Sequence, residues 1–319
     1  MVAAVARPAR LDPAKFRDPN VTARGERRAV VRLAAFKTLW FNTGTLCNLT
    51  CAHCYIESSP RNDALVYLSS EEVTEYLDEI AIRQLPIREI GFTGGEPFMN
   101  KALGAMLSIA LERGFEALVL TNGMKPMMRA RPWLATLNAA HPGRLVVRLS
   151  LDHYGPALHE QERGPGSFEK AMEGLCWLGQ NGFTVHVAGR RGFSDESEPA
   201  LRAGYARLFA ERGIPVDARD PVALMLFPEM DAQADVPEIT EACWGILGKS
   251  PQSVMCASSR MVVKRKGADH PVVLACTLLA YDSRFELGQT LADADRPIPL
   301  NHPHCAKFCV LGSAACSRP

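Results

Sequence analysis

The chain has 319 residues, of which 47% are hydrophobic and 22% are charged. This composition is typical of a globular protein with a large buried core, and it excludes a wholly disordered, collagen-like or coiled-coil chain. Thirty-six Lys and Arg residues balance 35 Asp and Glu residues, and the formal charge of +1 gives no electrostatic argument for a nucleic acid or an anionic membrane as partner. No apolar run approaches the roughly 20 residues that a membrane-spanning helix needs.

Ten cysteines are the unusual feature of the composition. The chain is too long and too poor in Cys to be a small disulfide scaffold. The N-terminal residues lack the apolar segment of a secretory signal, so we expect a cytoplasmic protein. In a reducing compartment, clustered cysteines more often bind a metal or carry out redox chemistry than form disulfides.

Strand and helix signals alternate along the chain after an arm rich in Pro, Arg and Ala, residues 1–35, which we expect to be ordered only against the rest. The patterns predict helices at 70–82, 103–113, 131–140, 168–181 and 199–212, and strands at 38–42, 89–92, 117–120, 145–151, 184–188, 215–217 and 222–227. Ser69 and Glu72 form a capping box before the first helix. The repeated strand–loop–helix order predicts a parallel sheet with right-handed crossovers and an active site at the carboxyl ends of the strands.

This rhythm changes near residue 238. Two short segments, 261–264 and 272–275, predict a hairpin around Lys266-Gly267, and no long helix follows. Six of the ten cysteines lie in this tail: Cys243, Cys256, Cys276, Cys305, Cys309 and Cys316. We therefore predict a core domain over residues 36–237 and a smaller domain over residues 238–319 that is organised by metal rather than by a large core.

The loop after the first predicted strand contains Cys47, Cys51 and Cys54 in a C-x3-C-x2-C spacing. Three thiolates this close can bind one face of a metal cluster and are too crowded for two disulfides. Zinc usually takes its ligands in two separated pairs. The spacing therefore favours a 4Fe–4S cluster with one iron open to a substrate or cofactor. A structural zinc site with His53 as the fourth ligand is the alternative.

The second motif is Gly94-Gly95-Glu96-Pro97, at the end of the next predicted strand. Two glycines let a ligand approach the backbone, and Glu96 offers a carboxylate to a cation. Alone this motif could be only a turn. Its place one strand after the cysteine loop makes it a strong signal.

Together these motifs resemble the radical S-adenosylmethionine (radical SAM) superfamily, over about residues 36–230. The resemblance implies an α/β fold, a partial (β/α)6 barrel related to the TIM barrel. It implies that Cys47, Cys51 and Cys54 are the catalytic ligands of a 4Fe–4S cluster, whose remaining iron binds the amino and carboxylate groups of SAM. By the same resemblance Gly94, Gly95 and Glu96 receive the SAM amino group, and Tyr55 lies near the adenine.

Further segments at predicted strand ends fit the same resemblance. Asn122 ends the strand after the glycine motif. Ser150 and Asp152 end the following strand, where the family often has a polar residue for the ribose. Arg163 begins an Arg-Gly-Pro-Gly-Ser-Phe stretch similar to one in the subgroup with additional C-terminal clusters, and it would pair with the SAM carboxylate. The structural alternatives are a helix cap for Asp152, a turn for Asn122 and a surface ion pair for Arg163.

The C-terminal cysteines resemble the SPASM or twitch extensions of radical SAM enzymes, which hold one or two auxiliary 4Fe–4S clusters. The C-x3-C-x6-C tail is sparser in Cys than the full SPASM pattern. We predict one auxiliary cluster, with a zinc knuckle as the alternative. Its expected ligands are Cys256, Cys276, Cys305 and Cys309, with Cys316 competing for the fourth place and Cys243 either at a second site or idle.

Some residues outside these motifs have both a structural and a functional interpretation. Cys176 lies beside Leu175 and Leu178 and is expected in the core. His186 alternates with two valines and could face the barrel interior. Arg190 and Arg191 could bind an anionic substrate or be solvated, and His302 and His304 are expected in a loop rather than as ligands.

The resemblance implies reductive cleavage of SAM to a 5′-deoxyadenosyl radical, which abstracts a hydrogen atom from a small-molecule or peptide substrate. A low-potential donor of the flavodoxin or ferredoxin type would supply the electron. The auxiliary cluster could take an electron from the substrate radical, bind the substrate or relay electrons. The segment before the barrel is too short for a leader-peptide-binding domain, which favours a small molecule or a peptide delivered by a separate partner. The rival hypothesis is a non-enzymatic iron–sulfur or zinc protein, which would not explain the glycine motif.

Overall fold

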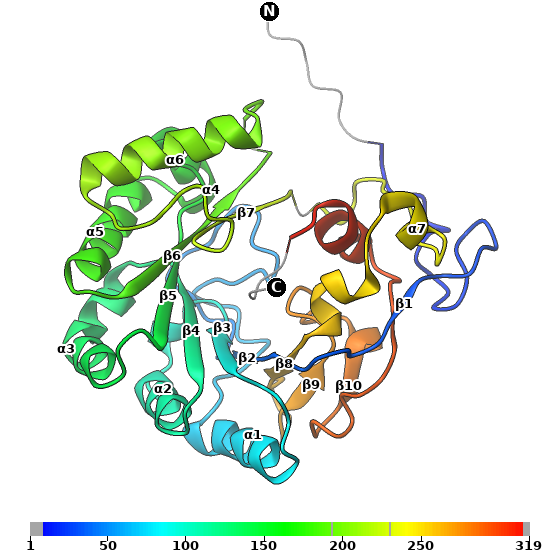
Figure 1. Ribbon diagram of the computed structural model, residues 1–319, viewed down its shortest axis with the longest axis horizontal. Coiled ribbons are helices and arrows are strands. Elements are labelled where there is room, and N and C mark those ends of the chain that lie inside the picture. Colours follow the sequence, from blue (N-terminus) through cyan, green and yellow to red (C-terminus); the bar gives the residue numbers. More distant parts are fainter. Residues whose placement is uncertain (1–8, 193, 230, 315–319) are drawn as a thin grey trace, which may run out of the picture.

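The computed structural model describes residues 9–192, 194–229 and 231–314 (Figure 1). Its main sheet has nine strands in the order β10-β9-β8-β2-β3-β4-β5-β6-β7. The strands from β2 to β7 are parallel and follow chain order, which confirms the partial (β/α)6 barrel. These strands are β2 (Thr38–Asn42), β3 (Glu89–Thr93), β4 (Glu116–Thr121), β5 (Leu145–Ser150), β6 (Thr184–Arg190) and β7 (Leu224–Phe227).

Helices cover the outer face of this sheet (Figure 1). The capping box is confirmed, because Ser69 Oγ accepts the N–H of Glu72 at 3.2 Å and a Glu72 carboxylate oxygen accepts the N–H of Ser69 at 2.9 Å. The apolar stripe of the first helix faces the core through Val73, Leu77 and Ile80. The covering helices are α1 (Ser70–Ile82), α2 (Leu103–Glu112), α3 (Lys125–Ala140), α5 (Ser167–Gln180) and α6 (Glu198–Arg212).

Two local predictions were wrong, and one short helix was missed. Residues 215–217 form no strand, because Pro215 lacks a backbone N–H and packs against Gly179 instead of pairing. Helix α3 begins six residues before the predicted residue 131, because Pro126 is accepted in its first turn and Pro132 is accepted inside it. The short helix α4 (Pro156–Arg163) was not predicted.

The tail extends the barrel sheet. The predicted hairpin is confirmed as β8 (Ser259–Val263) and β9 (Val272–Leu274), with β10 (Glu286–Gly288) beyond it. Strand β8 pairs in parallel with β2, and buried tail residues such as Val262 and Phe285 belong to the same hydrophobic core as the barrel. The division into domains at residue 237 stays a prediction.

A π-helix, Cys305–Leu311, closes the other side of the barrel. Its Phe308 ring lies 5.4 Å from the ring of Phe227 at the end of β7. Figure 1 shows the tail, in yellow to red, occupying the gap between β7 and β2, with the five-residue helix α7 (Cys243–Leu247) on its outer side. The tail therefore contacts both edges of the open barrel.

The described part of the N-terminal arm is ordered against this tail, as expected. Strand β1 (Val30–Val31) pairs with β11 (Ile298–Pro299). The guanidinium of Arg28 lies 2.5 Å from the carboxylate of Glu238, and both side chains are almost fully buried. Within the described residues, no helix combines the length and the apolar character that crossing a membrane requires.

Candidate active site

A cleft opens at the carboxyl ends of the parallel strands. The last residues of β3 to β7 all reach it: Thr93, Thr121, Ser150, Arg190 and Phe227. It is also lined by Cys47, Cys51, Cys54, Tyr55, Gly94, Gly95, Asn122, Asp152 and Arg163. Every residue of the predicted SAM site except Glu96 therefore lines one cleft, where parallel α/β barrels place their active sites.

The cysteine loop has an environment suited to a metal cluster. The Cys47 sulfur accepts the N–H of Leu49 at 3.4 Å, and the Cys54 sulfur accepts the N–H of Ser58 at 3.3 Å. Burial raises the pKa of Cys47 to about 12. Burial also raises the pKa of Cys51, although the nearby charge of Arg163 opposes this shift. Thiols in such surroundings ionise readily only when a metal replaces the lost hydration.

Among the described residues, no three His, Cys, Asp or Glu side chains come close enough to bind a single metal ion. A tetrahedral zinc site needs its donors at about 2.0–2.3 Å from one point. In an iron–sulfur cluster each thiolate binds a separate iron, which does not require the sulfurs to converge. The ring of His53, the candidate fourth zinc ligand, instead lies 2.8 Å from the carboxylate of Glu162.

The two glycines of the second motif allow two loops to pack backbone to backbone. The N–H of Gly95 donates to the oxygen of Gly44 at 2.8 Å. A Cβ atom on Gly95 would lie 2.3 Å from the oxygen of Leu46, the residue before Cys47. Gly94 has a φ of +149°, and a Cβ atom on it would lie 2.5 Å from the oxygen of Gly44. The glycines therefore position the cysteine loop as well as line the cleft.

Glu96 follows these glycines in the sequence and is almost fully buried. One carboxylate oxygen accepts from the Thr121 hydroxyl at 2.9 Å and from the N–H of Phe98 at 3.2 Å, and the other accepts from the N–H of Asn122 at 2.9 Å. Burial raises its pKa to about 7. Glu96 therefore joins the ends of β3 and β4, and its role as a SAM ligand stays a prediction.

Arg163 faces the cleft with its charge already balanced. Its Nε and Nη2 both donate to the carboxylate of Asp152, the latter at 3.2 Å. Burial opposes ionisation of Asp152, but the charge and hydrogen bonds of Arg163 outweigh it and hold the pKa of Asp152 below its ordinary value. Because this pair is buried at the end of β5, Arg163 forms no mere surface ion pair and Asp152 caps no helix by its side chain. Its pairing with a SAM carboxylate stays a prediction.

Asn122 forms the predicted turn and also lines the cleft. Its Oδ1 accepts the N–H of Met124 at 3.1 Å, and its Nδ2 donates to Asn48 Oδ1 at 2.9 Å. Asn48 belongs to the cysteine loop, so Asn122 connects this loop to the end of β4.

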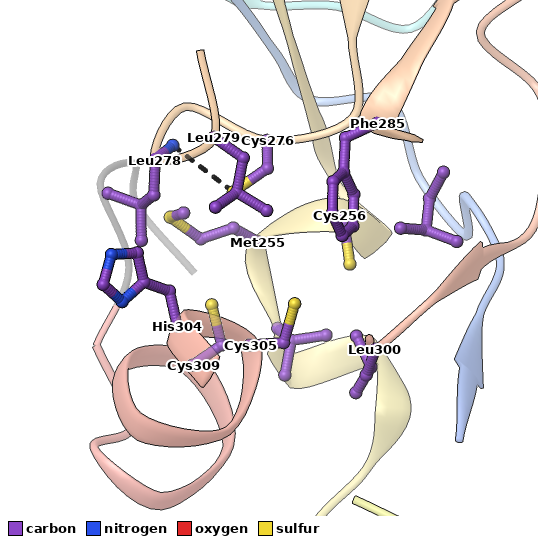
Figure 2. A pocket seen from close by; sticks show the side chains of 12 residues that line it. Met255, Cys256, Cys276, Leu278, Leu279, Phe285, Leu300, His304, Cys305 and Cys309 are labelled. Carbon is purple, nitrogen blue, oxygen red and sulfur yellow. Dashed lines mark hydrogen bonds between the residues drawn. The ribbon is translucent and has the colours of Figure 1, made fainter. Parts of the chain in front are cut away.

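A second, small cavity lies in the tail and brings the four expected auxiliary ligands together. In Figure 2 the sulfurs of Cys256, Cys305 and Cys309 point into the space between the π-helix and residues 255–257, and Cys276 lies above them. Burial raises the pKa of Cys256 to about 11 and that of Cys305 to about 12. Apolar side chains, among them Phe285 and Leu300, complete the lining. Four thiols in a buried apolar cavity suit an iron–sulfur cluster.

The remaining cysteines do not add to this cavity within the part of the chain that the structure describes. Cys316 lies outside the described residues. Cys243 does not line the auxiliary cavity, and its sulfur accepts the N–H of Thr240 at 3.4 Å. Cys176 was expected in the core but is only partly buried and packs against the edge of the core.

Most of the histidines and arginines outside the motifs are buried or form ion pairs within the fold. Arg190 lies 2.9 Å from the carboxylate of Glu162, and Arg191 lies 3.0 Å from that of Glu198, so neither is simply solvated. His186 is buried on the strand face of Ala188, which lines the cleft. The expected loop position is wrong for His304, which lies at the start of the π-helix and lines the auxiliary cavity.

Sequence reasoning missed two residues that bear on the site. Leu278 lines both cavities, so it forms part of the wall between them. No local signal marks it apart from its place two residues after Cys276. Glu162 contacts the cysteine loop, and the only available signal was its position beside Arg163.

Comparisons with known proteins agree with this geometry. The family model described as the Radical SAM superfamily matches residues 41–202, about half of the chain. AlbA, the subtilosin biosynthesis protein of Bacillus subtilis, is 33% identical over 44% of this chain and 30% of its own length. The mycofactocin maturase MftC of Mycolicibacterium smegmatis is 31% identical over 43% of this chain and 33% of its own length. The chain thus matches about a third of the length of these curated relatives.

Two solved structures share the fold. SuiB of Streptococcus suis bound to S-adenosylmethionine has a TM-score of 0.57 and 11% identity, over 80% of this chain and 63% of its own. The structure of anSMEcpe with bound AdoMet has a TM-score of 0.56 and 14% identity, over 81% of this chain and 79% of its own. At such identities these structures support the fold alone.

The family match, the barrel and the cysteine-lined cleft together place this chain in the radical SAM superfamily. Members of this superfamily use a 4Fe–4S cluster and SAM, and relatives with SPASM extensions carry auxiliary clusters.

Proposed function

We propose that this protein is a radical SAM enzyme with one auxiliary 4Fe–4S cluster. The observation that carries the proposal is the meeting of Cys47, Cys51 and Cys54 with the strand-end residues in one cleft, while four further cysteines line a cavity across a shared wall. When bound, the reduced cluster and SAM supply a 5′-deoxyadenosyl radical able to abstract a hydrogen atom from a substrate.

The residues of the chain would bind the cluster and SAM, orient them and shield them from water. Cys47, Cys51 and Cys54 would hold the cluster at the cleft. Gly94 and Gly95 would let the cysteine loop pack closely against the end of β3, because neither carries a side chain. Ser150, Asn122 and the Asp152–Arg163 pair supply polar groups for SAM. Tyr55, Ile56, Leu120, Phe227 and Phe308 also line the cleft, and such side chains exclude the water that would quench reactive species.

Cys256, Cys276, Cys305 and Cys309 would hold the auxiliary cluster, with Cys316 as the competing fourth ligand. The shared wall at Leu278 places this cavity next to the cleft, which supports a role in taking an electron from a substrate radical or in contacting the substrate. The net reaction would then be an oxidation or a bond-forming modification.

The substrate would be a peptide or a small molecule. A peptide is favoured by relatives whose names describe bacteriocin biosynthesis and mycofactocin maturation. A small molecule is the second candidate, because other relatives are named Fe-coproporphyrin III synthase and GTP 3′,8-cyclase. A low-potential flavodoxin or ferredoxin in the cytoplasm would donate the electron.

The test is anaerobic reconstitution with iron and sulfide, followed by dithionite and SAM. We expect about eight irons per chain and formation of 5′-deoxyadenosine. A Cys47/Cys51/Cys54→Ala triple variant should hold about four irons and form no 5′-deoxyadenosine. Cys176→Ala is the matched control, because Cys176 lines neither cavity, and it should behave like the wild type. Bound zinc without SAM cleavage in the intact protein would contradict the proposal.

A further inference from the structure

The turn between the second and third cysteines is attached to one residue, Glu162. The N–H of Ala52 donates to the main-chain oxygen of Glu162 at 2.9 Å. The N–H of His53 donates to one carboxylate oxygen at 2.8 Å, and His53 Nδ1 lies 2.8 Å from the other. Hydrogen bonds to a charged carboxylate are about twice as strong as neutral ones. Because this loop lies outside regular secondary structure, contacts of this kind determine its position.

Glu162 is itself held rigidly. It lies in the last turn of α4, and its side chain is only 3% exposed. Arg190, at the end of β6, lies 2.9 Å from its Oε1. The next residue, Arg163, binds Asp152 beyond the end of β5. Two adjacent residues of α4 therefore connect the cysteine loop to the ends of two barrel strands.

We propose that Glu162 is a positioning residue for the cluster bound by Cys47, Cys51 and Cys54. It fixes the turn at residues 52–53, and so sets the directions in which Cys51 and Cys54 present their sulfurs to a common cluster. Arg190, 2.9 Å from Glu162 Oε1, holds the Glu162 carboxylate in the orientation that this task requires. The inference rests on the proposed function and assigns a role to a residue that need not touch SAM or substrate.

The test compares three variants of the full chain reconstituted with iron and sulfide. Glu162→Ala removes both side-chain contacts to the turn. Glu162→Gln retains one oxygen acceptor for the N–H of His53. His53→Ala removes only the ring contact, and because that ring is 62% exposed the change should not affect folding. The readouts are the EPR spectrum of the reduced protein with and without SAM, and the rate at which a chelator removes iron. Thermal unfolding of the cluster-free proteins reports on folding.

We expect Glu162→Ala to lose the change that SAM makes in the EPR spectrum and to release the iron of one cluster at least several-fold faster than the wild type. Glu162→Gln and His53→Ala should show smaller changes of the same kind. Glu229→Gln is the matched control. Glu229 is a second carboxylate beside Arg190, at 3.5 Å, but it does not line the cleft that contains the cysteine loop. Its EPR spectrum and iron release should therefore equal those of the wild type.

Wild-type EPR spectra and wild-type iron release in both Glu162 variants would overturn the inference. This outcome is distinct from failure of the proposed function. That function fails if the wild-type protein forms no 5′-deoxyadenosine, whatever the Glu162 variants do to the cluster. Altered spectra in folded Glu162 variants support the positioning role independently of turnover.

Discussion

Gly95 shows how a single residue can serve both the fold and the site. Its missing side chain is required by the backbone of residues 45–46, which would lie 2.3–2.6 Å from a Cβ atom. The sequence pointed to these glycines as room for a ligand, and they do line the cleft. Their packing against the segment before Cys47 could not be predicted, because it joins two loops that are about 50 residues apart.

Gly95→Ala should therefore disturb the cysteine loop. Overpacking of this kind typically costs about 1–3 kcal/mol. We expect a lower free energy of unfolding for the cluster-free protein in urea, and less iron bound after reconstitution. Gly245→Ala is the matched control, since nothing lies within 4 Å of a Cβ atom there. The prediction is contradicted if Gly95→Ala is as stable as this control and binds as much iron. The two loops could then move apart without lowering the free energy of unfolding.

At the scale of elements, helix α4 carries the side chains that organise the site, yet hydrophobic periodicity did not predict it. Its buried residues are His159 and Glu162, which are polar, so the pattern that marks the other helices is missing. The remaining barrel helices and strands were predictable because their buried faces are apolar. Polar burial at α4 is only partly compensated: His159 Nδ1 accepts the N–H of Asp152 at 3.2 Å, whereas His159 Nε2 is buried without a hydrogen-bond partner among the described residues.

This burial predicts a dependence of stability on pH. Burial, together with the charge of Arg163, lowers the pKa of His159 from 6.5 to about 4, although Asp152 and Glu160 act in the opposite direction. The unfolded chain therefore takes up this proton first as the pH falls. The resulting stability is present above pH 6.5 and is lost as the pH falls through about 4. A shift of this size corresponds to roughly 3 kcal/mol.

His159→Asn retains an acceptor for the N–H of Asp152 but cannot take up a proton. We expect its free energy of unfolding to fall less steeply than that of the wild type between pH 6.5 and 4, as measured by urea unfolding of the cluster-free protein. His270→Asn, at an exposed loop position, should follow the wild-type slope. Equal slopes in all three proteins would mean that folding does not change the pKa of His159.

At the scale of the whole molecule, the barrel and the tail share a sheet and a hydrophobic core. The β/α units and both groups of cysteines could be predicted, because periodicity and cysteine spacing are local. The pairing of β8 with β2 and the buried Arg28–Glu238 ion pair join residues more than 200 positions apart. No local pattern specifies such contacts, so the sequence could not indicate that the sheet continues into residues 238–319.

The continuous sheet predicts that the cluster-free protein unfolds as one unit. Separating the tail would expose the edge of β2 and the apolar core that the barrel and the tail share. Trp40 in β2 and Trp244 in α7 report on the two parts. Variants that keep only one of these tryptophans, with Phe at the other Trp positions, should give the same midpoint in urea by fluorescence. A Trp244 transition clearly before that of Trp40 would instead show that residues 238–319 unfold independently, and the predicted boundary at residue 237 would then mark a true domain.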